Sequence, residues 1–289
     1  MPLRSTATHT YPITIRRHRE FASTMPEGHK THFLARQHTD WFAGQSLKVT
    51  SPQGRFRGDA RKVSGRVMDR CEAIGKHMFY HFENDRLIHV HLGRYGKYRM
   101  HSTPPPAPVG LVRMRLVGET WSLDLNGPTT CRVIDRQTRE EVIGKLGPDP
   151  LAEGSPARKK ATVWGSVRES RKPIGALVLD QSVVAGVGNI FRAELFFELG
   201  LDPRTPGAEL GKATFDLLWK SLVKMMRTGL KYGKIVTVTA REARAPLATL
   251  EGRDRFRVYG KAACPRCDRP IETIEIAARK LYWCPGCQG

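Results

Sequence analysis

The chain has no long apolar segment. None of its 289 residues lies in a run approaching the roughly 18 consecutive apolar residues that span a bilayer, so we expect no membrane partner. Acidic residues are also scarce, because 28 Asp and Glu stand against 48 Lys and Arg and leave a formal net charge of +20. A surplus of this size indicates a polyanionic partner, with nucleic acid as the first candidate. The alternative from composition alone is a source whose proteins are generally basic.

Cysteine is nearly absent from the first 263 residues, which contain only Cys71 and Cys131. A secreted disulfide framework would distribute cysteines along the whole chain, so this pattern favours a reducing compartment. The remaining four form two Cys-x-x-Cys pairs near the C-terminus: Cys264, Cys267, Cys284 and Cys287.

Sixteen residues separate the two pairs, a spacing typical of zinc ribbons, in which two thiolate pairs complete a tetrahedral shell. The pattern therefore predicts one structural Zn²⁺. Four protein ligands leave no open position for a reactive water, so this zinc would shape the protein without taking part in catalysis. A pair of exposed redox dithiols is the alternative.

The first half of the chain alternates between short apolar runs and turns. Residues 1–24 are rich in Thr, Ser and Arg and lack the apolar core of a secretory signal, so we interpret them as an extension that the mature protein need not contain. From His32 to Phe42 apolar residues recur at helical spacing. The following runs predict the strands of a sandwich or barrel-like domain. They cover residues 46–50, 65–71, 77–82, 87–92, 112–117, 121–125 and 130–134.

The hydrophobic period changes in the second half. Residues 158–173 are polar and basic and predict a connection between domains, whereas 174–200 and 212–232 have helical spacing. Residues 241–255 resemble a loop, and the alternation in 271–283 predicts a β-hairpin.

We therefore predict an α+β protein. An N-terminal β-sandwich domain with flanking helices would occupy residues 25–151, a helical domain 152–255, and a four-cysteine zinc-finger β-hairpin 256–289.

Two further motifs are weak when taken alone. Within residues 180–194, Gly186 and Gly188 interrupt a helix and Asn189 begins another. Exposed backbone N–H groups at such a helix start can bind phosphate, although a plain corner between helices has the same pattern. The segment Met25-Pro26-Glu27-Gly28-His29 carries no signal of its own.

In this order, the three motifs resemble those of the formamidopyrimidine-DNA glycosylase and endonuclease VIII (Fpg/Nei) family. The resemblance covers about 265 residues, from Met25 to the C-terminus, and is closer to the endonuclease VIII members. It extends to Gly75-Lys76, His91-Leu92-Gly93, Gly147–Leu151 and the tail RKLYWCPGCQ. It also implies a helix–two-turn–helix in the helical domain.

The resemblance implies a bifunctional DNA glycosylase and abasic-site lyase of base excision repair. Pro26, once N-terminal, would be a secondary amine that attacks C1′ of the sugar, and Glu27 would be its acid/base partner. Lys76 and Arg279 match family positions that contact phosphate and assist elimination, although an arginine at a hairpin turn is by itself usually a solvated surface charge. The Schiff base would lead to strand cleavage by β,δ-elimination.

The resemblance also implies a monomer that binds damaged double-stranded DNA in the bacterial cytosol or nucleoid. His91 and Asn189 match its phosphate-binding positions. Arg94 and Tyr95 stand where the formamidopyrimidine branch has a wedging Met, and Asn126–Cys131 replaces its Arg-Arg-Phe loop. We therefore expect Arg94 and Tyr95 to fill the gap left by the flipped base. Oxidised pyrimidines or abasic sites become the favoured substrates over 8-oxoguanine.

The residues before Pro26 leave three interpretations open. While Met25 precedes it, the Pro26 nitrogen is a tertiary amide and cannot form a Schiff base. Either Met25 is the true start, or processing exposes Pro26, or the extension stays and lyase chemistry is lost. Two non-enzymatic functions remain as rivals: a damaged-DNA-binding protein on the same scaffold, and an RNA- or ribosome-associated zinc-ribbon protein.

Overall fold

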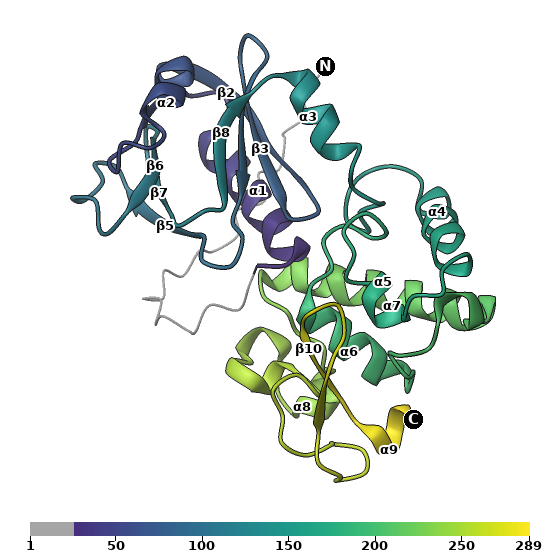
Figure 1. The fold of residues 1–289 in the computed structure, drawn as a ribbon. Helices are drawn as coiled ribbons and strands as arrows, with labels where there is room; N and C mark the ends of the chain where they lie inside the picture. Colours follow the sequence, from purple (N-terminus) through teal and green to yellow (C-terminus); the bar gives the residue numbers. More distant parts are fainter. Residues whose placement is uncertain (1–25) are drawn as a thin grey trace, which may run out of the picture.

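The computed structural model describes residues 26–289, so the expectations for residues 1–24 lie outside it. It has a sheet lobe and a helical lobe that carries a C-terminal hairpin (Figure 1). The sheet lobe contains α1 (Gly28–Phe42), β1 (Ser46–Thr50), α2 (Arg57–Val63), β2 (Arg66–Ile74), β3 (His77–Phe82), β4 (Arg86–His91), β5 (Lys97–Ser102), β6 (Val112–Val117), β7 (Trp121–Asn126), β8 (Thr130–Ile134) and α3 (Arg136–Ile143). The helical lobe contains α4 (Pro156–Arg168), α5 (Ile174–Leu177), α6 (Asn189–Leu199), α7 (Lys212–Tyr232), α8 (Ala240–Ala243), β9 (Glu272–Glu275), β10 (Lys280–Trp283) and α9 (Pro285–Gln288).

The eight strands of the sheet lobe are hydrogen-bonded in the order β5-β7-β6-β1-β2-β3-β4-β8, with every pair antiparallel. Strand β1 changes partner along its length, because Ser46 and Leu47 pair with β2 whereas Lys48–Thr50 pair with β6. Such a strand turns the corner between two packed layers. Both layers share one buried core, which confirms the expected sandwich; it includes Met68, Tyr80, Leu116 and Leu123.

Several strands begin or end at the same end of the sheet, next to the candidate site. His77 pairs with His91, and His91 with Thr130. In the other layer, Asn126 pairs with both Lys97 and Val112. The β2–β3, β4–β5 and β7–β8 connections therefore all leave from this end. We call it the site edge, and it is marked by His77, His91, Thr130, Lys97, Asn126 and Val112.

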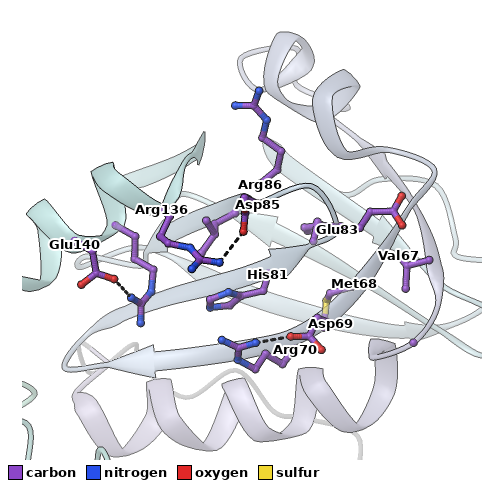
Figure 2. Close-up of a pocket in the computed structure, with 14 residues that line it drawn as sticks. Val67, Met68, Asp69, Arg70, His81, Glu83, Asp85, Arg86, Arg136 and Glu140 are labelled. Carbon is purple, nitrogen blue, oxygen red and sulfur yellow. Dashed lines mark hydrogen bonds and ion pairs between the residues drawn. The ribbon is translucent and has the colours of Figure 1, made fainter.

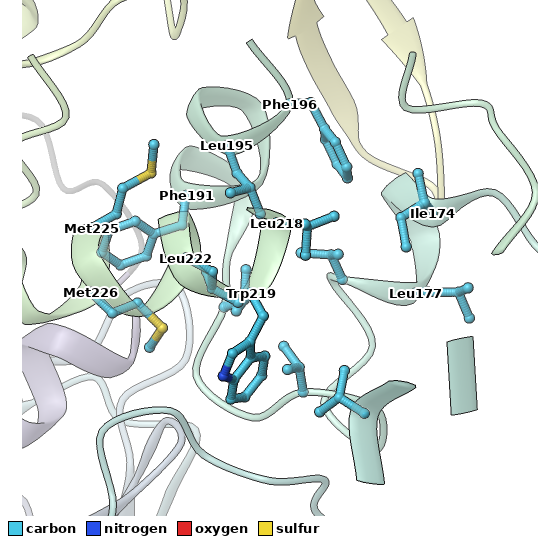
Figure 3. Packing of buried hydrophobic residues seen from close by; sticks show 14 of the residues in the cluster. Ile174, Leu177, Phe191, Leu195, Phe196, Leu218, Trp219, Leu222, Met225 and Met226 are labelled. Atoms are coloured by element: carbon cyan, nitrogen blue, oxygen red, sulfur yellow. The ribbon is translucent and has the colours of Figure 1, made fainter. Parts of the chain in front are cut away.

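The core of the helical lobe forms around α6, whose residues from Ile190 to Phe197 are all buried. Helix α7 covers it with one apolar face that includes Leu218, Leu222 and Met226 (Figure 3). Leu281 and Trp283 of β10 belong to the same core, so the hairpin is fixed to the helices. Within residues 26–289, no helix is long and apolar enough to cross a membrane.

Helix α1 joins the two lobes. A side chain at Gly229 of α7 would lie 3.0 Å from the ring of His29, which in turn packs edge-on against Phe191 at 5.2 Å. The Lys30 Nζ donates to the carbonyl oxygen of Gly233 at the C-terminal end of α7, where a positive charge is favourable. The interface therefore explains both a glycine within a helix and the lysine near the start of α1.

The structure corrects three expectations. Residues 156–168 form helix α4 and not a connection, because Ser155 caps its N-terminus and Pro156 occupies its first turn. Strand β5 lies outside the runs that the sequence predicts, since its half-buried side chains lack apolar alternation. Helix α1 begins four residues before the expected His32, at Gly28.

We expect Gly229→Val to destabilise the protein by about 1–3 kcal/mol, because the side chain would force α7 away from His29. Gly165→Val is the matched control, since a Cβ at this glycine of α4 meets nothing within 4 Å. Urea denaturation of both variants followed by circular dichroism checks this. Equal midpoints for the two variants would contradict the proposed packing.

Candidate active site

The carboxylate of Glu27 lies at the N-terminus of α6. Its Oε2 accepts the backbone N–H of Gly188 at 2.8 Å, and its Oε1 accepts that of Ile190 at 2.8 Å. A longer bond of 3.4 Å comes from the N–H of Phe191. Gly188 has no side chain with which to cap its own helix, so a residue 161 positions away does so. The positive end of the α6 dipole adds to this attraction.

The residue at position 188 must be glycine while Glu27 occupies this place. A Cβ there would lie 2.4 Å from the Cδ of Glu27. On the opposite side, the Gly28 N–H donates to the carbonyl oxygen of Gly186 at 2.7 Å, and a Cβ on Gly28 would lie 2.8 Å from the Gly186 Cα. The buried Glu27 and Gly28 are therefore held directly against the turn that precedes α6, and the half-buried Pro26 directly precedes them in the chain.

Burial raises the pKa of Glu27 above its usual value, although the charge of Lys76 and the backbone hydrogen bonds from α6 oppose the shift. This carboxyl group can therefore hold a proton at a pH at which an exposed glutamate has lost it. A group of this kind is suited to donate and retrieve a proton.

Lys76 lies in the β2–β3 turn at the site edge, and its side chain reaches the turn that precedes α6. Its Nζ donates to the carbonyl oxygen of Val187 at 2.6 Å. Burial lowers the pKa of Lys76 to about 8, the charge of Glu27 opposes the shift, and that of Arg279 adds to it. A substantial fraction of this amine is therefore neutral slightly above neutral pH.

Asp149 fixes the β2–β3 turn in front of Lys76. Its Oδ2 accepts the N–H of Gly75 and lies 2.7 Å from the His32 Nε2 of α1, and its Oδ1 accepts the N–H of Leu151. Burial opposes ionisation of Asp149, but these hydrogen bonds outweigh it and lower the pKa. The carboxylate thus connects α1, the turn and the segment that leads into the helical lobe.

Arg279 lies on the β9–β10 hairpin, which two side chains of α6 hold over the site. Asn189 Nδ2 donates to the carbonyl oxygen of Lys280 at 2.8 Å. The fully buried Arg192 donates to the carbonyl oxygens of Ile276 at 3.0 Å and of Arg279 at 3.4 Å, and its Nη2 also lies 2.5 Å from Asn189 Oδ1. The exposed side chain of Arg279 is close enough to act electrostatically on Lys76.

The remaining expected DNA contacts also lie at the site edge. The His91 ring is 4.7 Å from that of His77, and burial followed by the charge of Lys76 lowers the pKa of His91. In the β4–β5 connection, the guanidinium of Arg94 lies 5.5 Å from the ring centre of Tyr95. Tyr95 is 72% exposed, which makes it available to a partner.

The four C-terminal cysteines have the geometry of a tetrahedral thiolate site. Their Sγ atoms all lie within 4.8 Å of one another, with Cys267 and Cys284 at 3.5 Å and Cys264 and Cys287 at 3.8 Å. Zinc–sulfur bonds of about 2.3 Å would separate the sulfurs by about 3.8 Å. The site therefore fits one structural Zn²⁺, and contacts run across the two Cys-x-x-Cys pairs, as one shared metal requires.

A separate pocket of about 630 Å³ lies at the other end of β3 and β4, beside α3 (Figure 2). Its charged residues are largely paired with each other, as in Arg136 with Asp85 and Arg70 with Asp69. It contains none of the residues expected to act at the site.

Three family models match the chain in succession. The formamidopyrimidine-DNA glycosylase N-terminal domain matches residues 25–137, its H2TH domain 146–241, and the zinc finger found in FPG and IleRS 263–289. Endonuclease 8 1 of Mycobacterium tuberculosis is 43% identical over 91% of this chain and 100% of the relative. The chain belongs to the formamidopyrimidine-DNA glycosylase and endonuclease 8 family. It is therefore a DNA glycosylase of the base excision repair class.

More distant relatives agree with this membership. The formamidopyrimidine-DNA glycosylase of Thermus thermophilus is 29% identical over 92% of this chain and 99% of the relative. The fold matches Lactococcus lactis Fpg solved with N7-benzyl-Fapy-dG DNA, with a TM-score of 0.76 and 22% identity over 91% of this chain and 99% of that one.

Sequence reasoning missed two residues that organise the site. Asp149 stands within the Gly147–Leu151 motif, but no local pattern indicates its partners in α1 and the β2–β3 turn. Arg192 follows Asn189 at helical spacing. Its charge among the apolar residues of α6 is the one sequence signal that could have indicated a buried polar role.

We expect the Lys76 amine to titrate near pH 8 in NMR spectra of protein whose lysines carry ¹³C-methyl groups, with Lys76→Arg assigning the signal. Glu27→Gln should lower this pKa, since it removes a stabilising negative charge, and Arg279→Ala should raise it. A midpoint near the ordinary value of about 10.4 would contradict the burial of this amine.

We expect one zinc per chain by atomic emission, and its loss in Cys267→Ser. Cys131→Ser is the matched control, because this thiol lies in β8, outside the cluster. Unchanged zinc content in Cys267→Ser would contradict the four-cysteine site.

Proposed function

We propose that the protein is a bifunctional DNA glycosylase and abasic-site lyase whose nucleophile is the amine of Pro26. The observation that supports this most strongly is the buried Glu27 carboxylate, held at the start of α6 beside Pro26. Lys76 and Arg279 reach the same region from the β2–β3 turn and the hairpin. The same carboxylate caps α6, which a protein that only binds DNA would also need, but only a catalytic role uses its raised pKa.

In the proposed reaction, the Pro26 amine attacks C1′ of the damaged nucleoside. The bond from C1′ to the base breaks, and the base leaves with its electron pair and takes up a proton, in balance with the proton that the attacking amine releases. The C1′–O4′ bond then breaks as O4′ is protonated, and an iminium ion forms directly because the amine is secondary. Glu27 supplies the proton that opens the sugar, which its raised pKa allows. Lys76 and Arg279 hold the flanking phosphates and assist the β,δ-elimination that follows loss of the C2′ proton.

We further propose that damaged double-stranded DNA binds along the site edge of a monomer. Burial and the charge of Lys76 lower the pKa of His91, which favours the neutral ring, so His91 would give a phosphate a hydrogen bond without a charge. Asn189 would bind a phosphate at the start of α6, in addition to its hydrogen bond to the hairpin. Arg94 and Tyr95 would fill the gap that the flipped base leaves, and oxidised pyrimidines or abasic sites would be the substrates.

The same proposal divides the chain into a catalytic domain at 25–151, a helix–two-turn–helix domain at 152–255 and a zinc finger at 256–289. Its place of action would be the bacterial cytosol or nucleoid, where the DNA lies.

The chemistry requires a free amine at Pro26, so Met25 must be removed. The family model that matches from residue 25 supports a functional start at this point. If the extension is retained, the Pro26 nitrogen stays an amide and the protein can only bind damaged DNA, which is the alternative function of the chain.

We expect protein that begins at Pro26 to form a borohydride-trapped complex with duplex DNA containing thymine glycol or an abasic site. The full 289-residue chain, if unprocessed, should bind the same DNA and give no complex. Glu27→Gln in the shorter protein should reduce trapping from thymine glycol by at least about 100-fold. Lesion binding without a trapped complex from protein that begins at Pro26 would refute the enzyme and favour the binding protein.

A further inference from the structure

Exposed apolar side chains gather at the site edge beyond Tyr95. Among residues 26–289, five large hydrophobic side chains are exposed, and three of them belong here. Val109 is 61% exposed and Leu111 is 70% exposed, and both precede β6 in the long β5–β6 connection. Exposed apolar groups that cluster in this way mark a surface for a partner. We call Val109 and Leu111 the apolar ridge.

Side chains of β5 and β7 hold the backbone of the apolar ridge in place. Asn126 Nδ2 and Arg99 Nη1 both donate to the carbonyl oxygen of Val109, at 3.2 and 3.1 Å. The neighbouring connections are also packed together, because a Cβ on Gly93 would lie 1.8 Å from Thr129 Oγ1 and one on Gly127 would lie 3.1 Å from the Tyr95 carbonyl oxygen. The backbone that carries the exposed side chains of Val109 and Leu111 is therefore fixed.

Strand register places the ridge across from Tyr95. Lys97, two residues after Tyr95, and Val112, directly after Leu111, both pair with Asn126. Neighbouring strands lie about 4.8 Å apart, so these two strand starts are about 10 Å apart. This separation is comparable with the widths of DNA grooves, about 6–12 Å, and lets Tyr95 and the ridge contact different strands of one duplex.

The charge around the ridge matches a polyanion. Residues 92–97, 109–113 and 126–130 contain three basic residues and no acidic one. The proposed site lies at the same edge, through Lys76 and His91. The positive charge and the closeness to the proposed site both favour DNA as the partner that covers the apolar ridge.

We propose that Leu111, supported by Val109, contacts the base of the undamaged strand that has lost its partner, and so determines the preference for the opposite base. A flipped nucleotide leaves this base without a pair, and an apolar side chain shields the face that it exposes. The β7–β8 turn, Gly127-Pro128-Thr129, presents no large side chain that could do so. This inference rests on the proposed function, because it takes the lesion strand to lie at Lys76.

The test compares Leu111→Ser with Leu217→Ser, an exposed leucine of α7 at 57%. All forms carry the same N-terminus and bind a tetrahydrofuran lesion, either single-stranded or paired in turn with each of the four bases. We expect Leu111→Ser to weaken duplex binding by at least about fivefold relative to Leu217→Ser, and more than it weakens single-strand binding. The spread of affinities among the four opposite bases should shrink at least about threefold.

Equal affinities and equal spreads for the two variants would overturn the inference. The inference would also be overturned if Leu111→Ser lost binding to phosphatidylglycerol vesicles while its binding to duplex DNA stayed unchanged. That result would assign the apolar ridge to a membrane surface. The tetrahydrofuran site forms no Schiff base, so a failure of borohydride trapping would refute the proposed chemistry alone.

Discussion

The site depends on one interaction, the capping of α6 by the carboxylate of Glu27. Two short hydrogen bonds and the helix dipole hold this charge at a helix start whose own capping position, Gly188, has no side chain. The same contact fixes the beginning of α1, and therefore Pro26, against the helical lobe. Because the carboxylate is buried, its proton affinity rises, so the group that joins the two lobes is also the one suited to move a proton.

The other residues of the site are arranged around this contact by buried polar groups. Asp149 holds the turn that carries Lys76, and Arg192 with Asn189 holds the hairpin that carries Arg279. The hairpin is in turn packed through Leu281 on the helical core and shaped by the four cysteines. Positive groups can therefore be concentrated where a phosphate is expected, although burial, and to a lesser extent the charge of Arg279, lowers the pKa of Lys76.

Features set by local pattern could be predicted from the sequence. The helix at 212–232, most of the strands and the zinc cysteines depend on periodicity or spacing, and the structure and family models agree with them. Strand β5 and helix α4 could not be found this way, because one is half-buried and the other is mostly polar. The contact between Glu27 and α6 joins residues 161 positions apart. Only the resemblance to a family pointed to Glu27, and the partners of Asp149 had no signal at all.

The proposed chemistry requires the proline beside Glu27 to be the nucleophile. Peptide mapping by mass spectrometry of the borohydride-trapped complex, made with protein that begins at Pro26, tests it most directly. We expect the sugar remnant to be attached to the N-terminal nitrogen of Pro26. A remnant on Lys76, or on any other lysine, would contradict it.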